Sequence, residues 1–185
     1  DEKPLTFVLT RRNIQLPLVP YYGMRNDSVG YLLLTGFTRG TSLEVRHAVN
    51  ELKKKGMKAM VLDLRDNPGG VVEEAVDIVN LFIPKGRKVV YTKGKMPSTN
   101  MEFYTTGEPL DTVMPLVVLV NGGSASSAEI LSGSLQDMDR AVVMGERTYG
   151  KGLVQSVREL PFNRNLKLTI CRYYIPVSYT HLTLP

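Results

Sequence analysis

Two apolar runs in this chain are too continuous to be strands with one solvent-exposed face. They cover residues 58–64 and 116–120, and each leads into a glycine turn followed by a helix-like pattern. Strands covered on both faces are typical of parallel sheets that carry helices on both sides. Strand and helix patterns alternate through the middle of the chain, so the sequence predicts an α/β fold with a mainly parallel sheet.

Shorter patterns give the remaining elements. A threonine at residue 41 and a glutamate three residues later fit a capping box at the start of a helix, and Gly56 is a typical stop for it. Further helices are expected after Gly70 and over 125–138. Residues 93–113 are predicted to be irregular. Further strands are expected in the segments 4–16, 30–37, 88–92, 140–144 and from 153 onward.

Bulk properties narrow the function classes. A length of 185 residues suits one domain, and the net charge of +5 is mild and spread along the chain. There is no basic stripe with interleaved aromatics, so a nucleic-acid partner is not expected. The single cysteine, Cys171, cannot form an internal disulfide and is expected to be a packed thiol in a strand. No metal site or cofactor is predicted, and no apolar run reaches the roughly 20 residues of a membrane span.

Three segments together carry the groups needed for acyl transfer. Residues 63–70 form a strand that runs into a glycine turn, and residues 121–130 join a glycine turn to a serine cluster and a helix start. Residues 145–152 deliver one lysine on a glycine-flanked loop. The turns and the helix start offer backbone N–H groups, the serines a hydroxyl and the lysine an amine.

The histidines do not suit the role of catalytic base. His47 lies in a helical pattern among charged residues and is expected at the surface, and His181 lies in a terminal segment that departs from the rest of the chain. If a serine is activated here, a lysine is the better candidate base, because serine–lysine pairs are a known variant of the catalytic triad. Such a lysine must be uncharged near neutral pH, which burial favours.

Each motif also has a structural interpretation. Serines at helix starts are commonly caps, and a lysine between glycines is commonly a flexible surface residue. Residues 145–151 also have the spacing of a phosphate-binding P-loop. That motif requires serine or threonine where Gly152 stands, and a helix where residues 153–157 read as a strand. Nucleotide binding is therefore the weaker alternative.

The three segments resemble the carboxyl-terminal processing, or tail-specific, serine proteases. The family pattern has Asp-Leu-Arg-x-Asn-Pro-Gly-Gly, then Ser-Ala-Ser-Ala-Ser-Glu-Ile, then Gly-Glu-x-Thr-x-Gly-Lys-Gly-x-x-Gln. This chain has Asp63-Leu-Arg-Asp-Asn-Pro-Gly-Gly70, Ser124-Ala-Ser-Ser-Ala-Glu-Ile130 and Gly145-Glu-Arg-Thr-Tyr-Gly-Lys-Gly-Leu-Val-Gln155. The resemblance extends over roughly residues 5–176 in the same order, and the joint pattern is specific.

The resemblance implies a role for each site residue. Ser126 matches the nucleophile, Lys151 the general base, and Gln155 the residue that orients the lysine. The N–H of Ser127 and that of a glycine in the pair Gly69 and Gly70 would form the oxyanion hole. The serine hydroxyl and the lysine amine are expected within or near hydrogen-bond reach. One departure is Ser127, where the family usually has alanine.

The resemblance also implies a fold and an activity. The family core is a spiral of mainly parallel strands with flanking helices, similar to the crotonase and Clp protease cores. The implied activity is endopeptidase cleavage of protein substrates near their C-terminus through an acyl-enzyme, on partners that expose C-terminal tails. An inactive peptide-binding relative is the main alternative. By the same resemblance the protein is expected to be exported to the cell envelope or periplasm.

The resemblance divides the chain into three segments. Residues 1–12 resemble the last strand of a PDZ domain, and residues 13–176 form the protease core. After Pro176 the family usually continues Ser-Gly-Arg, whereas residues 177–185 read as a sequence unrelated to the core. This tail is expected to pack poorly and to add nothing to the site, so its deletion should shift the melting temperature little.

Overall fold

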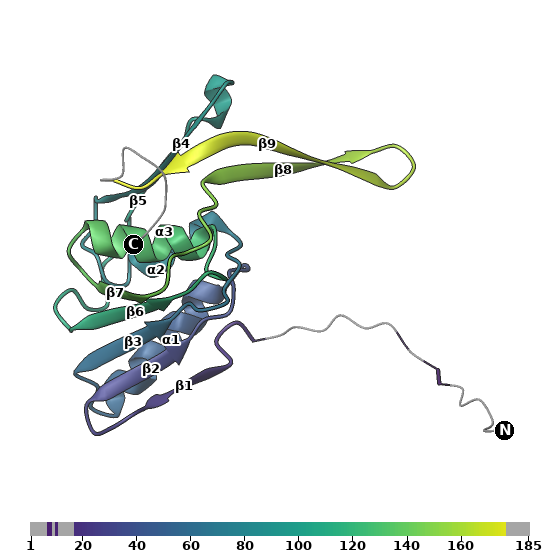
Figure 1. The fold of residues 1–185 in the computed structure, drawn as a ribbon. Coiled ribbons are helices and arrows are strands. Elements are labelled where there is room, and N and C mark those ends of the chain that lie inside the picture. Colours follow the sequence, from purple (N-terminus) through teal and green to yellow (C-terminus); the bar gives the residue numbers. More distant parts are fainter. Residues whose placement is uncertain (1–6, 9, 11–16, 177–185) are drawn as a thin grey trace.

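Two sheets with helices between and beside them make up the computed structural model, which describes residues 7–8, 10 and 17–176 (Figure 1). The first sheet has the strand order β1-β2-β3-β6-β7. Its strands are β1 (Tyr21–Met24), β2 (Val29–Leu33), β3 (Ala59–Asp63), β6 (Leu116–Val120) and β7 (Val142–Gly145). All neighbours in this sheet are parallel except β1 and β2. The predicted α/β class with a mainly parallel sheet is confirmed.

Parallel pairing brings the carboxyl ends of the central strands to one edge. Leu33 pairs with Asp63, Asp63 pairs with Leu119, and Val120 pairs with Gly145. The chain segments that follow β3, β6 and β7 therefore start side by side. These are the three segments that the sequence singled out, and ligand sites in open α/β sheets commonly form at this edge.

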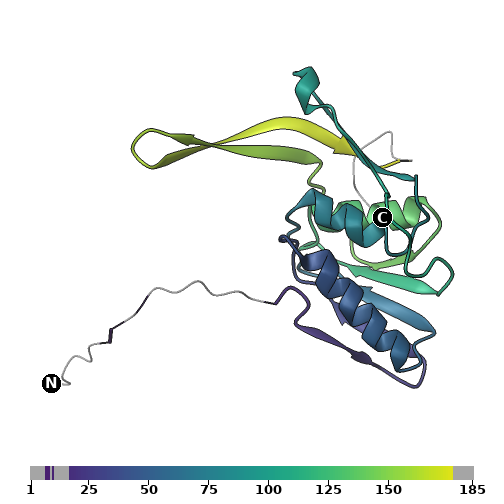
Figure 2. The same cartoon turned by 180° about the vertical axis from the view of Figure 1, so that it is seen from behind.

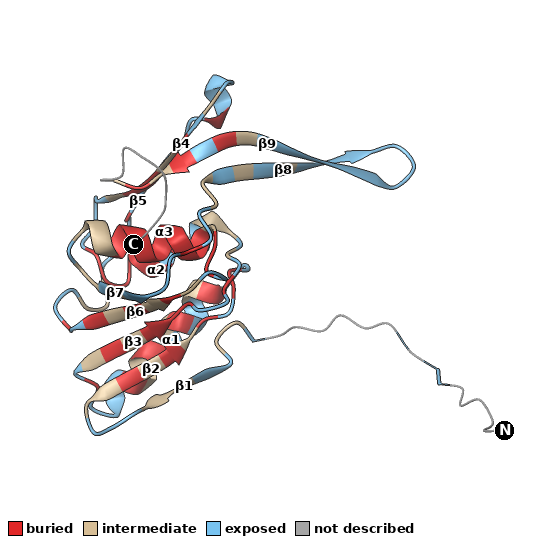
Figure 3. Ribbon diagram, viewed as in Figure 1, coloured by how far each residue is buried: buried red, intermediate tan, exposed pale blue. Residues whose placement is uncertain are grey.

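Three helices cover the first sheet. They are α1 (Thr41–Lys54), α2 (Val72–Val79) and α3 (Ser127–Asp137). Figure 2 shows α1 across the back of the sheet, and α2 and α3 lie between the two sheets in both views. Every residue of α3 up to Leu135 is buried, so this helix forms the centre of the molecule (Figure 3). The start of α3 is thus rigidly placed.

The capping box predicted for α1 is wrong. The N-cap is Gly40, with a positive φ of 93°, and Thr41 is already helical. The first N–H groups donate instead to Glu74 of α2, from Gly40 at 2.7 Å and from Ser42 at 2.8 Å. Burial alone would raise the pKa of Glu74, but these backbone hydrogen bonds outweigh it and hold the pKa below its usual range. A carboxylate from another helix does the capping.

The second sheet is antiparallel, and the sequence did not predict it as a separate layer. Its order is β5-β4-β9-β8, and β5 lies in the stretch expected to be irregular. Strands β8 and β9 form a long hairpin that extends away from the body and is largely exposed (Figures 1 and 3). The bounds are β4 (Lys88–Gly94), β5 (Glu102–Tyr104), β8 (Leu153–Leu160) and β9 (Arg164–Tyr174), with a short 3₁₀ helix over Pro97–Thr99.

Several further expectations can be checked. His47 is exposed on α1, and Cys171 is buried on β9, where burial raises the pKa of its thiol. The strand expected over residues 4–16 falls almost wholly outside the described residues. The tail 177–185, with His181, lies outside them entirely.

Asp111, away from the pocket, is a carboxylate with three hydrogen-bond donors. It accepts hydrogen bonds from Lys53 Nζ at 2.8 Å, from the N–H of Met114 at 2.8 Å and from the N–H of Val113 at 3.0 Å. Burial alone would raise the pKa of Asp111, but these donors outweigh it and hold the pKa at about 2. A carboxylate whose pKa is lowered by folding stabilises the fold above its unfolded pKa.

Asp111→Asn is therefore expected to lower the free energy of unfolding by about 2 kcal/mol at pH 7. The difference from the native protein should shrink as the pH falls from about 4 to about 2, where the native carboxylate is protonated. Urea unfolding at several pH values measures this. Glu51→Gln, which removes a surface pair with Lys54, is the control and should change little. A pH-independent difference would contradict the assignment.

Candidate active site

The glycine turn after β3 lies directly against the serine turn before α3. Gly69 has a φ of +88°, and a Cβ built on it would lie 2.5 Å from the carbonyl oxygen of Ala125. The same Cβ would lie 2.7 Å from Ser126 Cβ and 2.7 Å from the N–H nitrogen of Ser127. Only glycine fits such a close approach at this φ. Two segments far apart in the sequence thus meet at the serine cluster.

Two buried polar side chains hold these turns together. Asn67 donates from Nδ2 to the Leu34 carbonyl at 2.8 Å, and its Oδ1 accepts the N–H of Gly69 at 2.9 Å. Ser124 donates its hydroxyl to the Leu64 carbonyl at 2.7 Å. Both side chains are fully buried, so these bonds are made in a low-dielectric interior where they are costly to break. Ser124 is a structural serine.

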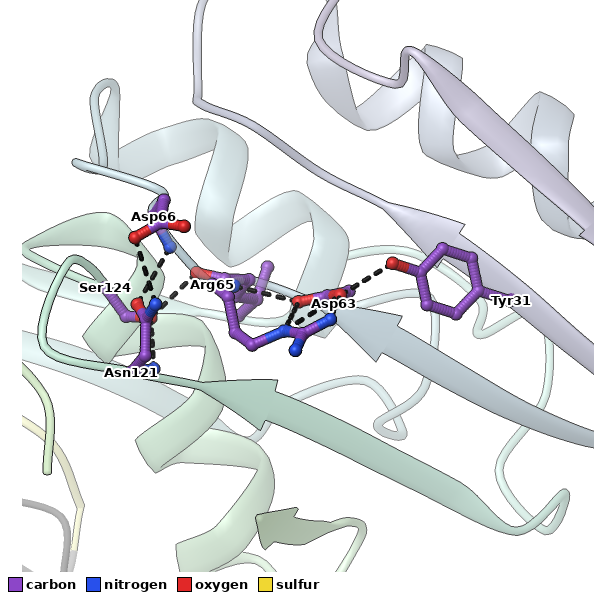
Figure 4. Close-up of polar contacts among 7 residues, drawn as sticks. Tyr31, Asp63, Arg65, Asp66, Asn121 and Ser124 are labelled. Atoms are coloured by element: carbon purple, nitrogen blue, oxygen red, sulfur yellow. Dashed lines mark hydrogen bonds and ion pairs between the residues drawn. The ribbon is translucent and has the colours of Figure 1, made fainter. Parts of the chain in front are cut away.

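A charged cluster fixes the end of β3 beside these turns (Figure 4). The buried carboxylate of Asp63 accepts the Tyr31 hydroxyl at 2.6 Å and the Arg65 guanidinium, with Nη2 at 2.6 Å. Burial alone would raise the pKa of Asp63, but its Arg65 and Tyr31 partners lower it below the usual range. Next to it, Asp66 and Asn121 are hydrogen-bonded at 2.9 Å and link the first two loops. Hydrogen bonds therefore join the loop after β3 to the loop after β6.

Ser126 has a strained backbone. Its φ of 57° and ψ of −116° are unusual for a residue other than glycine, and it is the N-cap residue of α3. Strain of this kind tends to cluster at functional sites. A serine on a sharp strand-to-helix turn is also the arrangement that presents the nucleophile in α/β-hydrolases. Ordinary capping needs no such backbone, so a cap alone does not account for Ser126.

Glu129 connects the serine turn to the lysine loop. Its carboxylate is fully buried (0% exposed) and accepts the N–H of Ser126 at 2.7 Å. It also accepts the N–H of Gly150 at 2.6 Å, the N–H of Lys151 at 3.0 Å and the Thr148 hydroxyl at 2.8 Å. One side chain thus fixes the backbones of Ser126 and Lys151 relative to each other. Sequence reasoning missed this role.

Tyr173 of β9 also contacts the lysine loop. Its hydroxyl donates to the carbonyl of Lys151, and the tyrosine is buried. Burial and the Glu129 charge raise the pKa of Tyr173 far above its usual range, against a smaller lowering by a hydrogen bond with the Ser126 side chain. Among the described residues, no hydrogen bond joins the Ser126 hydroxyl directly to the Lys151 amine. Tyr173 therefore holds the backbone of Lys151 and lies beside Ser126.

A pocket of about 800 Å³ opens beside these turns. Lys151 is half-buried in its wall, and Gln155, from the start of β8, lines the same pocket. Pro68, the glycine pair Gly122 and Gly123, and Ala125 contribute the other side. In the part of the chain that the structure describes, no group of three His, Cys, Asp or Glu side chains could hold a metal ion.

Comparison with known proteins identifies the family. Residues 28–182 match the model of peptidase family S41. The chain belongs to peptidase family S41. This is a family of serine-type peptidases. The resemblance read from the three motifs is thereby confirmed.

Relatives of this S41 chain include a carboxyl-terminal-processing protease of Synechocystis sp., 42% identical over 180 residues, covering 95% of the chain and 41% of that protein. A carboxy-terminal processing protease of Bacillus subtilis is 37% identical, and the match covers 83% of the chain and 32% of that protein. The solved structure of a photosystem II D1 C-terminal processing protease matches with a TM-score of 0.72 and 34% identity, and the match covers 83% of the chain and 39% of that structure. A putative S41 protease from Bacteroides fragilis shares the fold at TM-score 0.75 and 20% identity, covering 89% and 48%. The chain thus spans about two fifths of the length of the first curated relatives.

Candidate oxyanion donors in the S41 site lie on the two turns that meet. The N–H of Gly69 is occupied by Asn67, so Gly70 is the better candidate of the glycine pair. The N–H of Ser127 opens α3, where backbone donors have no partner within the helix. The Ser127 hydroxyl donates to the Gly70 carbonyl at 2.9 Å, and the side chain is fully buried. The serine that replaces the usual alanine therefore ties the two turns together.

Gly69→Ala is expected to abolish reactivity of Ser126 because the new methyl group would collide with the serine turn at a strained φ. A loss of stability of about 2 kcal/mol or more should accompany it. Reaction of Ser126 with a serine-directed probe and thermal unfolding measure the two effects. Gly40→Ala also replaces a glycine at positive φ, but in open space, and should leave the probe reaction intact. Normal labelling of the Gly69 variant would show that the turns are not in contact.

Proposed function

We propose that this chain carries the catalytic core of a serine endopeptidase that cleaves protein substrates near their C-terminus through an acyl-enzyme. The observation that carries the proposal is the arrangement around Glu129. A strained serine at a helix start and a loop lysine are fixed to one buried carboxylate, beside a glycine turn and an open pocket. The names of its relatives supply the reaction class, because several are C-terminal processing proteases.

In the proposed first step, the Lys151 amine takes the proton of the Ser126 hydroxyl. The serine oxygen then attacks the carbonyl carbon of the scissile peptide bond, and the carbonyl oxygen becomes negatively charged. The N–H groups of Gly70 and Ser127 would donate to that oxygen. Loss of one such donor typically costs about 100- to 1000-fold in rate. The helix dipole at the start of α3 adds to the same stabilisation.

The second half of the reaction reuses the same groups. As the C–N bond breaks, Lys151 returns the proton to the leaving amine, and the acyl group stays on Ser126 as an ester. Lys151 then takes a proton from water, and the hydroxide attacks the ester carbonyl carbon. As the bond between that carbon and the Ser126 oxygen breaks, Lys151 returns the proton to the serine oxygen and the substrate carboxylate is released. Gln155 lines the lysine's pocket and is proposed to orient its amine. No metal or cofactor takes part in this scheme.

The location proposed for the protein is outside the cytoplasm, in the cell envelope. Its relatives include bacterial processing proteases and chloroplastic ones. None of the helices over the described residues is long and apolar enough to cross a membrane.

The segment after the lysine loop does not have the structure that nucleotide binding by a P-loop requires. Residues 153–160 after the lysine loop form strand β8, whereas a P-loop requires a helix there. The remaining alternative is a peptide-binding relative without catalysis. It differs from the proposal in one measurable property, the nucleophilicity of Ser126.

Labelling with a serine-reactive fluorophosphonate, read by peptide mass spectrometry, tests the proposal. A single adduct on Ser126 is expected. Ser126→Ala should abolish it. Ser127→Ala is the matched control, because it changes the adjacent serine to the residue usual in the family and should keep the adduct on Ser126. An unlabelled but folded protein that still binds peptides would establish the inactive alternative, and an adduct on Ser127 would overturn the assignment of the nucleophile.

A further inference from the structure

One face of the β8–β9 hairpin continues outward from the serine and lysine. In β8, Leu153 and Gln155 line the pocket while Val154 between them packs against the core, so the odd-numbered residues of β8 face the pocket. Side chains alternate along a strand, and Val157 therefore extends this face outward along β8. Strand pairing sets Gln155 opposite Thr169 and Val157 opposite Lys167. The face that begins at Lys151 and Leu153 thus leads past Gln155 to Lys167.

The pocket follows this face. Lys151, Gln155 and Lys167 all line the same pocket, although Lys167 comes from a different strand and lies farther out on the hairpin. The charges on its walls are of one sign. Its lining includes the two lysines and no aspartate or glutamate among the described residues. A cleft lined by cations alone favours an anionic group on its ligand.

If Lys151 is neutral when it acts as the base, Lys167 supplies the remaining positive charge. An extended peptide advances about 3.3 Å per residue, so a chain lying along the hairpin from Ser126 would bring a residue about three to six positions from the scissile bond beside Lys167.

We propose that Lys167 is a subsite for a carboxylate of the peptide substrate, carried by the cleft that Lys151 and Gln155 also line. The inference rests on the proposed function and adds the substrate class: peptides with a negative charge several residues from the cleaved bond. The carboxylate has two possible sources, an aspartate or glutamate side chain or the free end of the peptide.

Binding without turnover tests the subsite separately from catalysis. In the Ser126→Ala protein, fluorescence anisotropy would compare labelled peptides that differ only by glutamate or glutamine at each position from one to six residues on either side of the scissile bond. A second pair would carry a free or an amidated C-terminus. The glutamate peptide at one position, or the free-acid peptide, is expected to bind about three- to tenfold tighter than its neutral partner. Which pair responds identifies the source of the carboxylate.

Lys167→Ala should remove this preference without weakening the neutral peptides, and Lys167→Arg should keep it. Arg158→Ala is the matched control, because it removes a cation from the opposite face of the same hairpin. The subsite would be overturned if the charged and neutral peptides of every pair bound equally well. It would also be overturned if Lys167→Ala weakened the binding of charged and neutral peptides by the same factor. Failure of fluorophosphonate labelling alongside a preserved charge preference would overturn the catalytic proposal and leave the subsite standing.

Discussion

Lys151→Ala is expected to lower kcat/KM for peptide hydrolysis by about 1000-fold or more while the fold stays intact. The two effects separate because the loop is held by its backbone. The Lys151 N–H donates to Glu129, and its carbonyl accepts from Tyr173, so both bonds survive truncation of the side chain. The side chain itself lines an open pocket, and its removal creates no cavity in the core.

Steady-state kinetics on a fluorogenic peptide and thermal unfolding would be measured together. Lys151→Arg should be as inactive as the alanine variant, because a guanidinium keeps the charge but cannot accept a proton near neutral pH. Lys85→Ala removes an exposed lysine remote from the pocket and should leave both measurements unchanged. Activity of Lys151→Ala within tenfold of the native protein would require a different base.

Local patterns were sufficient to predict the central layer. The apolar runs predicted to be strands became β3 and β6, and the helix after the serines is present within two residues of its expected start. The expectation that both faces of these strands are covered was wrong, because buried residues alternate with half-buried ones along each strand. The two elements were predictable because a short apolar strand and a helix with regularly spaced apolar residues each leave a local signature in the chain. Parallel pairing brings the three chemical segments to one sheet edge, which the local patterns did not specify.

Interactions between distant segments were beyond those patterns. Strand β9 pairs with β4, with Tyr174 opposite Tyr91, and an alternating run does not encode its partner. Glu129 was visible as part of the Ser-Ala-Ser-Ser-Ala-Glu motif, but a glutamate three residues after a helix cap is also an ordinary capping residue. Its bonds to Gly150 and Lys151 depend on the path of the loop after β7.

The fixed geometry of Ser126 and Lys151 should therefore be more sensitive to Glu129 than to any other buried carboxylate. In Glu129→Gln, one oxygen becomes an NH₂ group and must face two donors. If the NH₂ group faces Thr148 and Gly150, the Thr148 hydroxyl can rotate to accept a hydrogen bond, but the Gly150 N–H can only donate. If it faces Ser126 and Lys151 instead, both backbone N–H groups can only donate. The variant is expected to lose about 2 kcal/mol of stability, because at least one backbone donor that faces this buried side chain is left unpaired.

Glu74→Gln is the matched control. Glu74 is also buried, also caps a helix start and also accepts two backbone N–H groups, but those belong to α1, away from the pocket. Both variants should lower the melting temperature. Only Glu129→Gln should slow fluorophosphonate labelling of Ser126 in the folded protein, by about tenfold or more, because only there does the lost bond release the serine turn from the lysine loop. Equal labelling rates for the two variants would reduce Glu129 to a helix cap, and the common placement of serine and lysine would then depend on Tyr173.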